Sequence, residues 1–174
     1  MEQGIIQVYT GDGKGKTTAA MGQALRAYGR GLRVAVFQLL KAPGGTGEEQ
    51  GFAALNPKLS FLALGNGQFI IGRAPTGAEI EQAEQGWARI QAAMASGLYD
   101  LIVIDELSHT VNMGLLKPNQ VKADLQAKPA NLELVLTGSQ MPEAILGIAD
   151  LVTEMRMIKH PFQKGLDARQ GIEY

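Results

Sequence analysis

The chain has 174 residues and a formal net charge of −1, and 45% of its residues are hydrophobic and 19% are charged. These values are typical of one globular domain with a sizeable core. The small net charge disfavours non-specific nucleic-acid binding, no apolar run approaches the ~18 residues of a membrane helix, and the amino terminus does not resemble a signal peptide. The sequence contains no cysteine, which excludes disulfides, iron–sulfur clusters and cysteine-based zinc sites, so we expect a cytoplasmic location.

The first predicted strand and the first predicted helix enclose a glycine-rich segment. Gly4 to Tyr9 is predicted to form a strand, and Lys16 to about Tyr28 a helix that the following glycines end. The sequence from residue 10 to residue 17 is Thr-Gly-Asp-Gly-Lys-Gly-Lys-Thr. A strand followed by such a segment and a helix is typical of a phosphate-binding loop.

The composition of this segment fits the binding of a nucleotide triphosphate. Glycines let the backbone wrap around phosphate oxygens, Lys16 offsets their charge, and Thr17 offers a hydroxyl for magnesium. The usual pattern has a glycine where this chain has Thr10, with Gly11 next to it. The residues predicted to bind the triphosphate are Gly11, Asp12, Gly13, Lys14, Gly15, Lys16, Thr17 and Thr18.

Further strands and one amphipathic helix follow along the chain. Arg33 to Leu39 and Leu59 to Leu64 are predicted strands, and the segment from Ala42 to Asn56, rich in glycine, proline and glutamate, is predicted to be a mobile loop. A capping box at residues 76–79 begins a helix that ends near Gly97. The residues at helical spacing behind it, among them Trp87 and Met94, are interpreted as core.

A fourth predicted strand, Leu101 to Ile104, continues into the carboxylates of Asp105 and Glu106. Next to a phosphate loop, such carboxylates are predicted to orient magnesium or its waters. Leu132 to Leu136 and Leu151 to Met155 are predicted to be the last two strands. We therefore expect a single α/β domain over residues 1–174, a P-loop NTPase-like (RecA-like) mainly parallel sheet with helices on both faces. Ligands bind such sheets at the carboxyl ends of the strands.

The chain also resembles a known family, in the same order along almost its whole length. The motifs that carry the resemblance are Tyr9–Thr18, Gln38-Leu-Leu-Lys41, Asp105-Glu-Leu107, Thr137-Gly138, Lys159-His160-Pro-Phe162, Gly165 and Gln170-Gly-Ile-Glu-Tyr174. With these motifs the chain resembles the corrinoid adenosyltransferases of the CobA/CobO/BtuR type.

The resemblance implies transfer of the 5′-deoxyadenosyl group of ATP to Co(I) of a reduced corrinoid, with release of triphosphate, in adenosylcobalamin biosynthesis or salvage. The triphosphate would lie in the loop in the reverse sense to ordinary ATPases, which agrees with the shifted glycine at Thr10. Magnesium (or Mn²⁺), a homodimer and a flavoprotein reductant are further implications. The segment 158–174 would contribute to the corrinoid cleft.

Individual roles follow from the same resemblance. Lys16, Thr17 and Glu106 would be catalytic, and Thr17, Asp105 and Glu106 would hold the metal. The remaining residues matched to the substrate site are Arg26, Gln38, Lys41, Phe69, Thr137, Gly138 and His160. Phe69 would replace one aromatic of the family's Gly-Phe-Thr-Trp stretch, whose Trp has no counterpart here.

Two alternatives stay open from the residues. One is another P-loop ATPase or small-molecule kinase, which the displaced glycine and the lack of an evident arginine finger disfavour. The other is a nucleotide- or corrinoid-binding module without catalysis. His109, three residues after Glu106, is interpreted as structural, because no second histidine supports a metal site.

Overall fold

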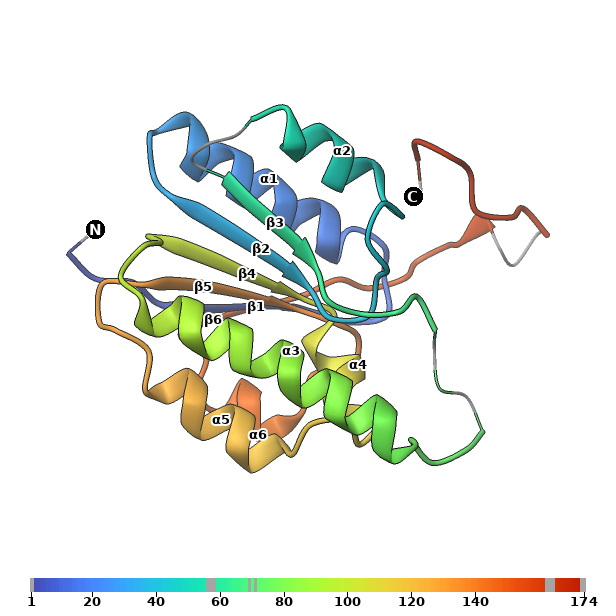
Figure 1. Ribbon diagram of the computed structural model, residues 1–174. Helices are drawn as coiled ribbons and strands as arrows, with labels where there is room; N and C mark the ends of the chain where they lie inside the picture. The colour runs from blue at the N-terminus through green and yellow to red at the C-terminus, as the bar shows by residue number, and fades with distance from the viewer. Residues whose placement is uncertain (1, 56–58, 69, 71, 162–164, 173–174) are drawn as a thin grey trace.

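The computed structural model describes residues 2–55, 59–68, 70, 72–161 and 165–172. Its centre is a six-stranded sheet with the strand order β3-β2-β4-β5-β1-β6, and every neighbouring pair is parallel (Figure 1). The strands are β1 (Ile6–Thr10), β2 (Val34–Gln38), β3 (Leu59–Ala63), β4 (Leu101–Asp105), β5 (Glu133–Thr137) and β6 (Leu151–Glu154). The α/β fold predicted from the sequence is thus confirmed.

Helices cover both faces of the sheet, as Figure 1 shows. One face carries α1 (Lys16–Gly29) and α2 (Gly47–Ala53). The opposite face carries α3 (Gly77–Ala95), α4 (Leu107–Asn112), α5 (Pro118–Gln126) and α6 (Glu143–Leu146). Each layer of helices buries a separate apolar cluster against the strands. No helix of the described segments combines the length and the apolar character that crossing a membrane requires.

The burial of each strand depends on its position in the sheet. β2, β4 and β5 are buried at every residue, because helices cover both faces of these inner strands. β6 lies at the edge and is exposed at every residue, including Leu151 and Val152. The carboxyl ends of β1, β2, β4 and β5 meet along one edge of the sheet, where polar side chains replace the apolar core.

The amphipathic helix begins as predicted. Thr76 and Glu79 of α3 exchange both hydrogen bonds of a capping box. Trp87 and Met94 are buried core residues, which confirms their interpretation, and the Trp87 indole N–H donates to Asp124 of α5 at 2.7 Å.

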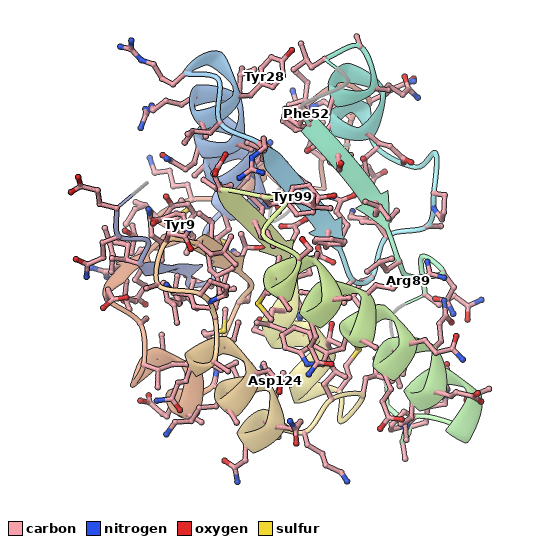
Figure 2. All side chains as sticks on the ribbon, turned by 60° about the vertical axis from the view of Figure 1, so that its left-hand side comes forward. Tyr9, Tyr28, Phe52, Arg89, Tyr99 and Asp124 are labelled. Atoms are coloured by element: carbon pink, nitrogen blue, oxygen red, sulfur yellow. The ribbon has the colours of Figure 1, made fainter. Side chains whose placement is uncertain are left out.

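The prediction of a loop from Ala42 to Asn56 is wrong for its central part, which forms α2. The Thr46 hydroxyl accepts the backbone N–H of Glu49 and caps this helix. Phe52 points from α2 toward the sheet (Figure 2) and stacks on Phe61 of β3, with 5.8 Å between ring centroids. Phe61 lies outside the predicted loop, on the strand that follows it, so the glycine-rich composition of the loop gave no sign of this contact.

Candidate nucleotide site

The glycine-rich loop lies between β1 and α1, at the carboxyl edge of the sheet. Gly11 and Gly15 have φ angles of 97° and 115°, in the left-handed region that glycine adopts without strain. The Lys16 ammonium donates to the carbonyl oxygens of Gly11 at 2.8 Å and Gly13 at 2.7 Å. Lys16 thus folds over its own loop and concentrates positive charge at the start of α1.

Asp105 joins the loop to three strands of the sheet. Its fully buried carboxylate accepts the hydroxyl of Thr17 at 2.9 Å and the hydroxyl of Thr137 at 2.6 Å, both on Oδ1. Its second oxygen accepts the side-chain amide of Gln38 at 3.0 Å. The structure therefore brings together four residues that the sequence analysis selected from four separate elements.

Glu106 stands next to this network in a strained backbone conformation, with φ 62° and ψ 28°. Its backbone N–H donates to the Thr137 hydroxyl at 2.9 Å, which holds the residue in place. Burial raises the pKa of the Glu106 carboxyl to about 7, and repulsion by Asp105 adds to the rise, while Lys41 and Lys16 oppose it. A carboxyl group this perturbed beside a phosphate loop is a candidate functional group.

Two buried oxygen atoms lack a donor among the described residues, Glu106 Oε2 and Gln38 Oε1. Buried acceptors are costly to leave unpaired, so they mark a place where a cation or a donor group of a ligand belongs. The Thr17 hydroxyl uses its proton on Asp105, which leaves its lone pairs for a cation. These hard oxygen atoms fit Mg²⁺ or Mn²⁺.

The described segments contain no cluster of three or more His, Cys, Asp or Glu side chains able to hold a metal ion by themselves. Magnesium at nucleotide sites commonly takes one or two protein oxygens and completes its shell with phosphate and water. The residue set thus fits a metal that arrives with a nucleotide.

A cavity of about 690 Å³ opens in front of these residues, at the carboxyl ends of the strands. Its volume is in the range of small-molecule sites. It is lined by Lys14, Gly15, Lys16, Thr17, Thr18, Gln38, Lys41, Thr46, Gly47, Glu48, Glu106, His109, Ser139, Gly171 and Ile172.

Several of these lining residues were not predicted. Thr46 and Glu48 come from the start of α2, and Ser139 from the loop after β5. His109 lies on the cavity wall one turn after Glu106, where burial and then Lys16 lower its pKa, while Asp105 raises it. Its interpretation as a structural residue stays a prediction, and the structure adds that it lines the cavity. His109 follows Glu106 by three residues, and in a helix this spacing places two side chains close together. That spacing could have indicated from the sequence that His109 lies near the site.

Thr137 and Gly138 support the site from behind. Thr137 bonds Asp105 and Glu106, as described above. Gly138 has a φ of 145°, and a Cβ there would lie 2.0 Å from the Ser108 hydroxyl oxygen. The Ser108 hydroxyl in turn donates to the carbonyl of Ser139 at 2.5 Å. The glycine is required because the loop after β5 passes directly over α4.

The loop residues Gly11, Asp12 and Gly13 are not among the residues that line the cavity. Three more predicted residues lie away from it or outside the described residues. Arg26 is exposed in the last turn of α1, about 15 Å along the helix axis from Lys16, and donates to Gln23. His160 is half-buried in the segment after β6 and is not among the residues that line the cavity. Phe69 lies outside the described residues. Its neighbours Gln68 and Ile70 line a second, small cavity of about 30 Å³ beside the end of β2.

Comparisons with known proteins agree with this geometry. Residues 2–174 match the family model of the ATP:corrinoid adenosyltransferases BtuR/CobO/CobP. The chain is 36% identical over 173 residues to a corrinoid adenosyltransferase of Pseudomonas aeruginosa, covering 99% of this chain and 85% of the relative. It is also 36% identical over 173 residues to the corrinoid adenosyltransferase CobA of Salmonella typhimurium, covering 99% of this chain and 87% of the relative.

One solved structure shares the fold. The flagellar accessory protein FlaH of Methanocaldococcus jannaschii superposes with a TM-score of 0.60 at 11% identity, over 88% of this chain and 72% of FlaH. At this identity the likeness shows the fold alone.

Proposed function

The chain belongs to the ATP:corrinoid adenosyltransferase family, and from this premise we propose how its residues carry out the transfer. The protein is a transferase with ATP and a corrinoid as its substrates. A role as a binding module without catalysis, or as another ATPase or kinase, is not favoured. The observation that carries the mechanism is the Asp105 network, which joins the phosphate loop, β2 and β5 in front of one cavity.

In the proposed reaction, Co(I) of the corrinoid attacks the ribose C5′ of ATP with its electron pair. A cobalt–carbon bond forms, the C5′–oxygen bond breaks, and inorganic triphosphate leaves with the electron pair of that bond. Because Co(I) is itself a strong nucleophile, the protein needs no serine, cysteine or general base for the attack. It must align the two substrates and stabilise the leaving group.

The phosphate loop is proposed to stabilise the leaving triphosphate. Lys16 and the backbone N–H groups at the start of α1 place positive charge where negative charge develops. Preorganised donors of this kind lower a barrier more than mobile water does, since they need no reorientation during the reaction.

The metal ligands are proposed to be Thr17 and Glu106, with Asp105 orienting Thr17. Bound Mg²⁺ or Mn²⁺ would supply charge neutralisation for the phosphate oxygens. The hydrogen bond from Thr17 to Asp105 turns the Thr17 lone pairs away from the network. The Glu106 oxygen without a donor supplies the second protein ligand.

The corrinoid is proposed to lie on the open side of the cavity, near Gln38, Lys41 and the segment 158–174. The exposed apolar Leu151 and Val152 of edge strand β6 support the proposal of a homodimer. A flavoprotein is the proposed source of the electrons that produce Co(I), as the resemblance to the family implies.

The test is an anaerobic assay with reduced corrinoid, ATP and Mg²⁺. We expect a cobalt–carbon product in the visible spectrum and one triphosphate released for each corrinoid converted. Formation of ADP and phosphate without an alkylated corrinoid would contradict the proposal. An assay with several corrinoids identifies the preferred one.

A further inference from the structure

The phosphate loop is bound to the segment that follows β6 at three consecutive residues. The Gly13 N–H donates to the carbonyl of Met155 at 2.7 Å, and the carboxylate of Asp12 accepts the backbone N–H of Met157 at 3.1 Å. The Lys14 ammonium donates to the carbonyl of Ile172 at 3.2 Å. In Figure 1 this segment leaves β6 at the carboxyl edge of the sheet, the edge at which α1 begins.

Two loop glycines are required by this contact. A Cβ at Gly11 would lie 2.3 Å from the Met155 carbonyl oxygen, and a Cβ at Gly13 would lie 2.8 Å from that oxygen and from the Arg156 carbonyl carbon. Both obstacles are backbone atoms, which cannot turn aside as a side chain can. The glycines therefore serve the approach of the C-terminal segment as well as the wrapping of phosphate.

The direction of the Asp12 carboxylate is the informative detail. A negative side chain in a phosphate loop repels a triphosphate unless it is turned away or bound to a cation. Here it accepts a backbone N–H of the C-terminal segment. The Gly13 N–H is likewise bound to this segment, so it is not available to a phosphate oxygen in this arrangement.

We propose that Asp12 is a positioning residue, which anchors the backbone at Met155–Met157 against the phosphate loop and so helps Gly171 and Ile172 of the C-terminal segment to form a wall of the triphosphate site. Gly171 and Ile172 line the main cavity, and Lys14 holds them at their end. The proposal deepens the proposed function and rests on it for the identity of the ligand. It assigns Asp12 to the backbone of the C-terminal segment and not to the nucleotide or metal.

Limited trypsin digestion of the full chain tests the anchor without any catalytic assay. Arg156 and Lys159 are exposed cleavage points directly beside the Asp12 contact. Asp12→Ala removes the acceptor, whereas Asp12→Asn keeps an oxygen acceptor and removes only the charge. Asp167→Ala is the matched control, because this exposed carboxylate of the same segment makes no hydrogen bond to the described part of the phosphate loop.

We expect Asp12→Ala to release residues 157–174 up to about tenfold faster than wild type, as loss of one hydrogen bond to a charged group implies. Asp167→Ala should be cleaved at the wild-type rate, and Asp12→Asn at a rate between wild type and Asp12→Ala, because a neutral acceptor makes a weaker hydrogen bond. Equal cleavage of Asp12→Ala and wild type would overturn the proposal. So would Asp12→Asn cleaved as fast as Asp12→Ala, since charge and not the acceptor would then be responsible.

The adenosyl-transfer assay supplies the second readout. If the segment is a wall of the triphosphate site, Asp12→Ala should raise KM for ATP by about tenfold and lower kcat much less, with recovery in Asp12→Asn. A fall in kcat at unchanged KM would instead place Asp12 at the reacting groups. If wild type forms no cobalt–carbon bond, the proposed function fails, while the digestion pattern still decides whether Asp12 anchors the segment.

Discussion

The side-chain hydroxyl of Thr10 accepts the backbone N–H of Met141 at 3.1 Å and thereby joins the end of β1 to the loop after β5. The Thr10 carbonyl accepts the N–H of Met155 at 2.8 Å, which ties the same residue to the end of β6. Thr10 is buried and is the last residue of β1, so the phosphate loop begins at Gly11. The displaced glycine of the sequence pattern therefore has a structural reason, a strand residue that binds two neighbouring segments.

Thr10→Gly is expected to destabilise the protein by roughly 2–4 kcal/mol. The substitution leaves the buried Met141 N–H without its acceptor and places glycine in a strand. Thr10→Ser keeps the hydroxyl and should cost less than about 1.5 kcal/mol. Urea unfolding measures both, and equal losses for the two variants would show that the hydroxyl is not the stabilising group.

The raised pKa of Glu106 makes the free energy of unfolding depend on pH. Burial, and then repulsion by Asp105, raises its pKa from 4.5 in the unfolded chain to about 7 in the folded protein. Between these values the unfolded chain has lost the proton that the folded chain keeps, so the free energy of unfolding falls as pH rises from about 4.5 to about 7. At ~1.4 kcal/mol for each pH unit between the two pKa values, the loss is about 3 kcal/mol.

Glu106→Gln is the matched variant, because its amide has nearly the same shape and does not titrate. In metal-free buffer the difference in unfolding free energy between wild type and variant should change by about 3 kcal/mol between pH 4.5 and 7.5. Parallel pH curves for the two proteins would contradict the raised pKa.

Two glycines with opposite surroundings predict opposite effects of alanine. Gly138 has a φ of 145° and faces the Ser108 side chain and backbone, so Gly138→Ala should cost roughly 2–4 kcal/mol. Gly22 is exposed inside α1 with no atom within 4 Å of a built Cβ, so Gly22→Ala should add about 0.5–1 kcal/mol. Thermal unfolding of the two variants checks both signs, and a destabilised Gly22→Ala would show that α1 contacts something on this face.

The strands and the phosphate loop were predictable because their signals are local. Short apolar runs such as Leu101–Ile104 form buried parallel strands, and the glycine-rich turn into α1 is encoded within eight residues. The two carboxylates at the end of β4, Asp105 and Glu106, were predictable for the same reason. α2 was not, since its Phe52 packs on Phe61 of the following strand, outside the segment whose composition indicated a loop.

The full set of residues that line the main cavity could not be predicted from the sequence either. Thr46, His109 and Ser139 have no common motif, and they meet only because the carboxyl ends of β2, β4 and β5 are neighbours in the sheet. The contact of Asp12 with Met157 joins residues 145 positions apart. Such pairings depend on strand order, which the single sequence did not contain.

Lys16→Ala is expected to lower the rate of adenosyl transfer by about three orders of magnitude, which corresponds to roughly 4 kcal/mol of transition-state stabilisation. Burial lowers the pKa of Lys16 below its ordinary value, and the charges of Asp12, Glu106 and Asp105 offset part of this fall. The hydrogen bonds of Lys16 to Gly11 and Gly13 place its positive charge over the loop.

The control for loss of one positive charge is Arg89→Ala, because Arg89 is an exposed residue on α3 (Figure 2). This variant should keep the wild-type rate. Single-turnover kinetics with saturating ATP separate the effect on the chemical step from the effect on binding. Turnover of Lys16→Ala near that of wild type would show that the triphosphate leaves from a different place.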